Sequence, residues 1–149
     1  MELNIRKVQE EDIEDIFQMI CELAEFEKLT HLVEITKEKL KKDLITDSSI
    51  QALVAIQDSE RVGYAIYFYN YSTFLGKKGI YLEDLYVRPK FRKLGIGKNL
   101  LLKLIEQAKN EDLGRVEWSV LDWNKSAIDF YVSLGASVLP DWRICRVVI

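Results

Sequence analysis

The stretch Tyr81–Lys98 constrains the fold more than any other part of this chain. It reads YLEDLYVRPKFRKLGIGK, begins with alternating apolar residues and ends with two glycines one residue apart. Alternation with a period of two indicates a strand, and apolar recurrence at i, i+4 and i+8 indicates a helix. Such recurrence follows the glycines directly, at Leu100, Leu101, Leu104, Ile105 and Ala108. The stretch therefore predicts a strand, a short loop and a helix, with the glycines at the join.

This join has the features of a phosphate-binding loop. Gly95 and Gly97 allow the backbone to turn without Cβ clashes and allow a ligand to approach closely. The first amides of a helix have no partner within the helix, and the helix dipole adds positive potential there. Five basic residues lie between positions 88 and 98 and no acidic residue between 85 and 105, although the chain has a formal net charge of −3. This local reversal of sign suits a polyanionic ligand.

The spacing of the loop excludes two common nucleotide-binding motifs. The pattern G-x-x-x-x-G-K-[ST] is absent because Arg92 stands five residues before Gly97 and Asn99 follows Lys98. The pattern G-x-G-x-x-G is absent because Leu100 replaces its last glycine. What remains is Arg92-x-x-Gly95-x-Gly97, directly after a predicted strand.

That pattern resembles the acetyl-CoA-binding motif of the GNAT N-acetyltransferases, [Q/R]-x-x-G-x-[G/A]. The resemblance implies that the loop holds the pyrophosphate of coenzyme A and that the end of the preceding strand offers backbone groups to the pantetheine arm. The residues implied for the pyrophosphate are Arg92, Lys93, Leu94, Gly95, Ile96, Gly97 and Lys98. Those implied for the pantetheine arm are Leu85, Tyr86 and Val87.

Size and composition predict one globular domain covering residues 1–149, with 48% hydrophobic and 30% charged residues. The chain has no apolar run long enough to span a membrane, and its start, MELNIRKVQEED, is too acidic for a signal peptide. The two cysteines, Cys21 and Cys145, lie far apart, which favours thiols over a disulfide. No Cys/His cluster indicates a metal, and the acidic balance argues against nucleic acid as a partner. We therefore expect a cytoplasmic protein.

Periodicity along the chain predicts alternating strands and helices. Helices are expected at 11–26, at 36–47 with Thr36 as the N-cap, from the glycine loop to about Asp112 with Gly114 near its C-cap, and at 125–134 closed by Gly135. Turns are expected at 57–61 and 76–79. Strands are expected at 3–8, 50–56, 62–71, 80–87, 115–120 and 143–149. This order indicates a mixed α/β (α+β) domain, and it resembles the whole GNAT fold, a central, mostly antiparallel twisted sheet flanked by helices.

Acetyl transfer to an amine requires a neutral nitrogen. A lysine-type amine has a pKa of about 10.4, so forming the neutral amine at pH 7 costs about 4.6 kcal/mol. A nearby carboxylate can bind the ammonium and then accept its proton, directly or through water. Glu83 and Asp84 stand just before the expected pantetheine strand, and as strand neighbours they point to opposite faces unless a bulge intervenes. We expect Glu83 to be the base; the alternative is that both are solvated edge carboxylates.

Tyr131 is the candidate general acid. A phenol is neutral at pH 7 and can protonate a departing thiolate. The segment Asn124-Lys125-Ser126-Ala127-Ile128-Asp129-Phe130-Tyr131 resembles the GNAT context N-x-x-[AS]-x-x-[FL]-Y, in which the tyrosine is the acid and the asparagine contacts the cofactor. The alternative for Tyr131 is a packing aromatic on an amphipathic helix.

Further segments resemble the diamine acetyltransferases, the group that contains spermidine/spermine N1-acetyltransferase and thialysine N-ε-acetyltransferase. These are 81–84, 68–73, 120–124, 135–137 followed by 141–143, and the end of the first helix at 22–27. The resemblance implies an amine site with Phe26, Glu27, Glu83, Asp84 and Trp142, and a homodimer. Polyamine-specific members carry an acid and a tryptophan where this chain has Ser72 and Phe74.

The loss of one carboxylate favours a shorter acceptor than a polyamine. The sequence thus predicts an acetyl-CoA-dependent N-acetyltransferase that acts on a small aminoalkyl substrate, such as a thialysine- or lysine-like amino acid or a diamine, by direct attack in a ternary complex. Neither cysteine lies in the motif, which argues against an acyl-cysteine route. Three alternatives stay open: a polyamine acceptor, a protein or peptide amine as acceptor, and a non-catalytic acyl-CoA-binding sensor.

Overall fold

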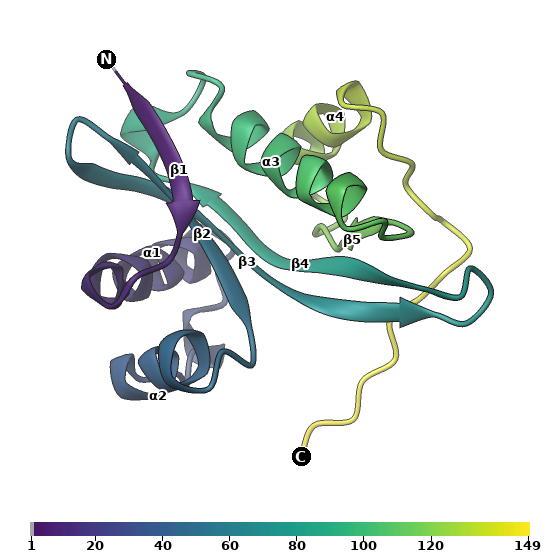
Figure 1. Cartoon of the computed structure of the whole chain (residues 1–149), viewed down its shortest axis with the longest axis horizontal. Helices are drawn as coiled ribbons and strands as arrows, with labels where there is room; N and C mark the ends of the chain where they lie inside the picture. Colours follow the sequence, from purple (N-terminus) through teal and green to yellow (C-terminus); the bar gives the residue numbers. More distant parts are fainter. Residues whose placement is uncertain (1) are drawn as a thin grey trace. The chain divides into compact units, whose positions relative to one another are not determined.

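Five strands form one sheet in the order β1-β2-β3-β4-β5 in the computed structural model, which describes residues 2–149 (Figure 1). Neighbouring strands are antiparallel, except that β4 and β5 are parallel. The mixed α/β fold with a largely antiparallel sheet is confirmed. The strands are β1 (Leu3–Lys7), β2 (Gln51–Gln57), β3 (Glu60–Ser72), β4 (Lys77–Val87) and β5 (Val116–Trp118).

Helices cover both faces of this sheet, with α1 and α2 on one side and α3 on the other (Figure 1). The side chains of β3 alternate accordingly: Tyr64 and Ile66 share a core cluster with residues of α1 and α2, whereas the Tyr67 hydroxyl bonds Gln107 of α3. The helices are α1 (Ile13–Phe26), α2 (Lys37–Lys41), which continues as one π-helical turn (Lys42–Thr46), α3 (Ile96–Asn110) and α4 (Lys125–Ser133). Thr36 caps α2 as predicted, accepting a hydrogen bond from the Lys39 amide at 3.1 Å.

The described chain divides into two compact units. The first extends through Trp118 and contains the sheet and α1–α3. The second is Ser119–Ile149 and contains α4. Each is described by itself below.

A β-bulge interrupts the pairing of β3 with β4. Ile66 pairs with Asp84 and Tyr67 with Leu82, so Glu83 is an extra residue that has no partner on β3. Paired residues of antiparallel strands project to the same side of the sheet. Leu82 therefore shares the α3 side with Tyr67, whereas Asp84 shares the α1 side with Ile66. The bulge thus puts Leu82 and Asp84, two residues apart in β4, on opposite faces of the sheet.

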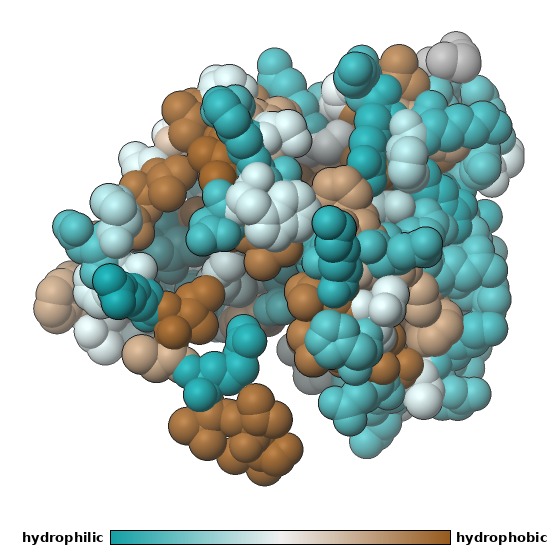
Figure 2. All heavy atoms as spheres, turned by 180° about the vertical axis from the view of Figure 1, so that it is seen from behind, coloured by the Kyte–Doolittle hydropathy of each residue, from teal (hydrophilic) through white to brown (hydrophobic). Residues whose placement is uncertain are grey.

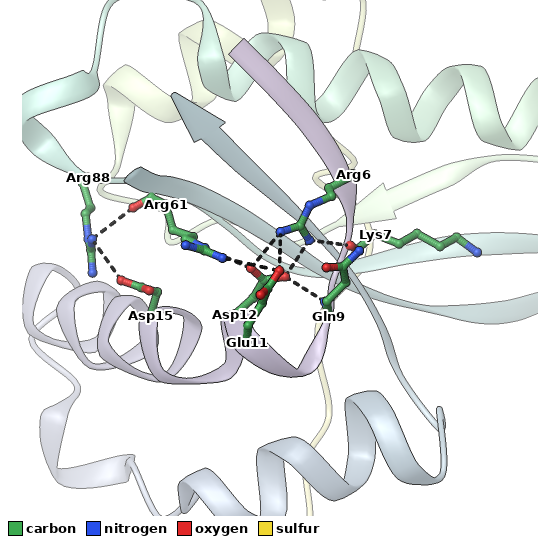
Figure 3. A network of polar contacts seen from close by, with 8 residues as sticks. All are labelled: Arg6, Lys7, Gln9, Glu11, Asp12, Asp15, Arg61 and Arg88. Carbon is green, nitrogen blue, oxygen red and sulfur yellow. Dashed lines mark hydrogen bonds and ion pairs between the residues drawn. The ribbon is translucent and has the colours of Figure 1, made fainter. Parts of the chain in front are cut away.

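A buried ion network joins β1, the start of α1 and β3 (Figure 3). Asp12 has no exposed side-chain surface, and its carboxylate accepts hydrogen bonds from Arg6 at 2.7 and 3.1 Å, from Arg61 at 3.0 Å and from the Gln9 amide at 2.7 Å. Burial raises the pKa of Asp12, but the bonds from Arg6, Gln9 and Arg61 outweigh it and leave that pKa lowered. The network fixes the chain entry into α1.

Three predictions about elements were wrong. Within the described residues, 143–149 forms no strand, although its apolar pattern suits one. The turn between β3 and β4 is at 73–76, because both strands extend beyond the expected range. The left-handed residue after α3 is Asp112, with φ of 55°, and not Gly114. A Cβ at position 114 would lie 2.8 Å from Cδ1 of Leu75, a half-exposed side chain that would have to shift to admit it.

Candidate active site

The glycine loop leads into α3 as the sequence predicts. Gly95 is the N-cap of α3 and has φ of 82°, which favours glycine, and Lys93 also has a positive φ of 66°. Cβ atoms built on Gly95 would meet nothing within 4 Å, so the backbone here is open to a ligand. Around it lie exposed basic side chains, among them Lys90, Lys93 and Lys98. This is an open, positively charged cradle of helix amides, the donor set that a pyrophosphate group requires.

Arg92 does not point away from the protein. Its Nε donates to the carbonyl oxygen of Val87 at 2.8 Å, and its guanidinium carbon lies 5.2 Å from the ring centre of Phe26 and 5.4 Å from that of Tyr86. Phe26 is the last residue of α1, so Arg92 ties the glycine loop to the C-terminal end of that helix. The predicted cofactor loop and the predicted amine site therefore meet at this arginine.

The exposed edge of β4 lies beside this loop. Pairing of β4 with β5 ends at Leu82 and Trp118, whereas β4 continues to Val87. The last residues of β4 therefore lie beyond the β5 ladder, where backbone groups on that side can meet another chain-like partner. Of the predicted residues 85–87, Val87 has its carbonyl bonded by Arg92.

Carboxylates converge on the α1 face next to the bulge. Asp84 is half-buried, and its pKa is raised to about 6 by burial and by the negative charges of Glu83 and Glu27. Glu27, at the C-cap of α1, has a pKa raised by burial. The structure thus brings Glu27 close to the adjacent acids Glu83 and Asp84, and all three are residues that the sequence analysis assigned to the amine site.

Asp84 differs from Asp12 in what neutralises it. Asp12 lies between two arginines, whereas no lysine, arginine or histidine of the described chain forms an ion pair with Asp84. Its hydrogen-bond donor is the Tyr64 hydroxyl, 3.1 Å from Oδ2. A half-buried carboxylate beside two further acids has a deficit of positive charge. An ammonium group would meet that deficit.

The second unit holds the other predicted residues, Asn124, Tyr131 and Trp142. Asn124 is the N-cap of α4, and its side-chain oxygen accepts from the Ala127 amide at 3.3 Å. Tyr131 lies in the last turns of α4 with its ring 5.4 Å from that of Phe130. Gly135 ends the helix with φ of 94°, as predicted. Trp142 is 79% exposed in a segment without helix or strand.

Sequence reasoning missed two polar residues of the first unit. The Tyr64 hydroxyl binds Asp84, and Glu22 accepts from the Tyr86 hydroxyl at 3.0 Å and lies 3.3 Å from Nε of Arg88. Tyr64 stands inside an apolar strand pattern, in which an aromatic residue signals only packing. Glu22 lies among the acids of α1, and only the pairing of distant elements distinguishes it.

Comparison with known proteins identifies relatives over most of the chain. Residues 13–136 match the model of the Acetyltransferase (GNAT) family. Thialysine N-epsilon-acetyltransferase of Mus musculus is 42% identical over 146 residues, with 92% of this chain and 85% of that protein covered. L-ornithine N5-acetyltransferase of Arabidopsis thaliana is 32% identical, with 95% of this chain and 82% of that protein covered. The predicted resemblance to this group is confirmed.

Solved structures show the same fold. An aminoglycoside acetyltransferase from an uncultured soil metagenomic sample, solved with sisomicin, has a TM-score of 0.81 at 20% identity, with 99% of this chain and 96% of that chain covered. In the part of the chain that the structure describes, no helix is both long and apolar enough to cross a membrane.

Proposed function

Because the chain belongs to the acetyltransferase (GNAT) family and its relatives include N-acetyltransferases, we propose that it acetylates the side-chain primary amine of a small aminoalkyl substrate. The acceptor would be a thialysine- or lysine-like amino acid or a diamine. The observation that carries this proposal is the half-buried Asp84, which lies beside Glu27 and Glu83 and pairs with no cation of the described chain. The relatives named for thialysine and ornithine support an amino acid with an amine at the end of its side chain.

The acetyl donor we propose is acetyl-CoA, which supplies the acetyl group as a thioester. The residues of the loop fit it: the open backbone at Gly95 and the first amides of α3 can receive the pyrophosphate, and Lys93 and Lys98 add positive charge. The edge of β4 at Leu85 and Tyr86 can pair with the pantetheine amides. Arg92 holds the loop in place through its hydrogen bond to the Val87 carbonyl and its contact with the Phe26 ring. Asn124 contributes from the second unit by family resemblance.

At the amine end, Asp84 and Glu27 attract the ammonium form of the substrate, and the exposed ring of Phe26 packs against its alkyl chain. Trp142 is proposed for the same site by family resemblance alone. These groups raise the local concentration of the cationic acceptor. A shorter acceptor than a polyamine suits Ser72 and Phe74 in the β3–β4 hairpin.

We propose Glu83 as the base that removes the amine proton, directly or through water, and Tyr131 as the acid that protonates the departing sulfur. The amine then attacks the thioester carbonyl directly while both substrates are bound. One observation favours Asp84 as a second candidate base, because its pKa of about 6 lies near neutral pH, where a general base is most efficient. The variants Glu83→Gln and Asp84→Asn separate the two: the substitution of the true base lowers kcat, and that of a binding residue mainly raises KM.

The remaining proposals concern the whole chain. The family match at 13–136 crosses both units, which supports one functional domain. A homodimer is supported by exposed apolar residues in two places, the hairpin at Tyr71, Phe74 and Leu75 and the C-terminal segment. Tyr67 of the same strand pair is buried and bonds Gln107 of α3, so its ring belongs to the protein core and not to such a surface. A cytoplasmic location stays a prediction of the sequence.

The deciding experiment is a thiol-release assay with acetyl-CoA and a panel of acceptors: thialysine, lysine, ornithine, putrescine, spermidine, spermine and a lysine-containing peptide. We expect turnover with the amino acids or putrescine at kcat/KM at least tenfold above spermine. Turnover of the peptide alone would move the function to protein acetylation. Binding of acetyl-CoA without turnover of any acceptor would favour the sensor.

A further inference from the structure

We propose that Tyr64 is a positioning residue of the amine site, because its buried hydroxyl donates to Oδ2 of Asp84 and fixes this carboxylate toward the acceptor amine. The inference rests on the proposed function in one respect, the use of Asp84 as an amine ligand. It adds a residue that does not touch the substrate and that no sequence pattern indicates.

The position of Tyr64 leaves its hydroxyl little choice of partner. Tyr64 lies in the middle of β3 and is 0% exposed, packed in the core cluster with Ile16 and Met19 of α1. A buried hydroxyl without a hydrogen-bond partner is costly. Its O–H lies 3.1 Å from Oδ2 of Asp84, across the β3–β4 pair. Asp84 lies on the same side of the sheet as Tyr64, because Tyr64 pairs with Tyr86 and Ile66 pairs with Asp84 in one unbroken register.

The bond opposes every other influence on Asp84. The titratable groups that act on this carboxylate are Tyr64 on β3, Glu83 on β4 and Glu27 at the C-cap of α1. Tyr86 and Glu22 form a separate hydrogen-bonded pair. Burial and the charges of Glu83 and Glu27 raise the pKa of Asp84, whereas the hydrogen bond from Tyr64 lowers it. Tyr64 itself stays neutral, because burial and the charge of Asp84 raise its pKa well above 10. It is therefore a permanent donor that favours the charged form of Asp84.

The test replaces Tyr64 with Phe, which keeps the ring and removes the donor. The carboxyl carbon resonance of Asp84, followed by NMR, should titrate about one pH unit higher than in the unaltered protein, since hydrogen bonds to charged groups are strong. The acid limb of kcat/KM for the amine should move by the same amount. Below pH 6 this gives an amine KM up to about tenfold higher, converging with the unaltered protein above pH 8, while the KM for acetyl-CoA stays within about twofold.

Tyr67→Phe is the matched control. Tyr67 lies on the same strand, is equally buried, and bonds the neutral Gln107 through its hydroxyl at 3.3 Å. It should lose a comparable amount of stability and leave the titration of Asp84 and the acid limb unchanged. If Tyr64→Phe and Tyr67→Phe give the same pH profile, Tyr64 is a packing residue and the proposal is overturned.

A measurement on the unaltered protein covers the case in which Tyr64→Phe does not fold. The Cζ resonance of Tyr64 should change with a midpoint near the Asp84 pKa of about 6, and that of Tyr67 should not. A flat Tyr64 resonance across that midpoint contradicts the proposal. The NMR result does not depend on turnover. A coupled titration in a protein that acetylates no amine would therefore refute the proposed function and keep the Tyr64–Asp84 pair.

Discussion

At the scale of single residues, the buried Asp12 and the half-buried Asp84 are two carboxylates removed from water and neutralised in opposite ways. Asp12 is neutralised by Arg6 and Arg61 within the fold, and its pKa is lowered. Asp84 receives only a phenol hydroxyl from the described chain and lies among acids, and its pKa is raised to about 6. The ion pairs of Asp12 stabilise the folded protein. The unpaired carboxylate of Asp84 instead leaves a site for a cation from outside the protein.

Asp84→Asn should stabilise the unliganded protein at pH 7. A carboxylate whose pKa is higher in the folded state than in the unfolded state favours folding below the unfolded pKa of 3.8, and loses that contribution as the pH rises through about 6. The substitution should therefore raise the free energy of unfolding at pH 7 by about 1–3 kcal/mol. Urea unfolding at pH 7 and pH 4 checks this, with the gain expected only at pH 7. Equal effects at both pH values would contradict it.

Tyr131→Phe should lower kcat about 100-fold, on the scale usual for a general acid, with coenzyme A binding retained. Steady-state kinetics and calorimetric titration with coenzyme A give the two values. Tyr71→Phe serves as the control, since Tyr71 is 60% exposed in the β3–β4 hairpin. An unchanged kcat in Tyr131→Phe would remove this residue from the mechanism.

At the scale of elements, the turn into α3 depends on backbone shape more than on side chains. Gly95→Ala should weaken coenzyme A binding about tenfold or more, because a residue with φ of 82° is strained when it carries a Cβ. Gly97→Ala is the matched control: its Cβ would meet only Cγ2 of Val87, at an ordinary 3.7 Å. Calorimetric titration measures both dissociation constants. Equal losses in the two variants would place the effect in side-chain contact with the ligand.

The ion network around Asp12, which connects β1, the start of α1 and β3, should lose its contribution to stability in acid. Asp12→Asn should lower the free energy of unfolding by about 3 kcal/mol, because it leaves two partly buried arginines with only the exposed Glu11 as counter-charge. The stabilisation is present above pH 3.8 and is lost as the pH falls through the lowered pKa of the folded state. Glu14→Gln, which removes an exposed ion pair with Lys37, should leave the urea midpoint unchanged. A similar midpoint for both variants would show that the network adds nothing.

At the scale of the whole molecule, the C-terminal segment is the region whose surface least suits an isolated chain. Ile144, Val147, Val148 and Ile149 are each at least 70% exposed. Figure 2 shows an apolar group standing clear of the rest of the surface at its lower edge. Exposed apolar groups of this kind mark interaction surfaces. Ile144→Glu with Val147→Glu should convert a dimer to a monomer in light scattering, whereas Lys125→Glu should not. A monomer in the unaltered protein would refute the proposed homodimer.

The sequence predicted most of this architecture because each element has its own period. The stripe of α3, the Thr36 cap and the glycine loop are local patterns, and all are present in the structure. The last strand was wrong because alternation shows that residues 143–149 can form a strand, not that a partner lies beside them. The bulge, the Tyr64–Asp84 bond and the Arg6–Asp12–Arg61 network depend on register and on residues distant in sequence, which no local period contains.

The bulge at Glu83 also makes the number of residues between Leu82 and Asp84 important for the site. Counted from the hairpin end of β4, the additional residue Glu83 is what places Asp84 on the side of α1 instead of the side of α3. A substitution at 83 would change chemistry and keep this geometry. Deletion of residue 83 would leave Asp84 present in the sequence and rotate it, or the strand before it, to the opposite face. Among relatives and designed variants, insertions and deletions between Leu82 and Tyr86 should therefore be far rarer than substitutions there.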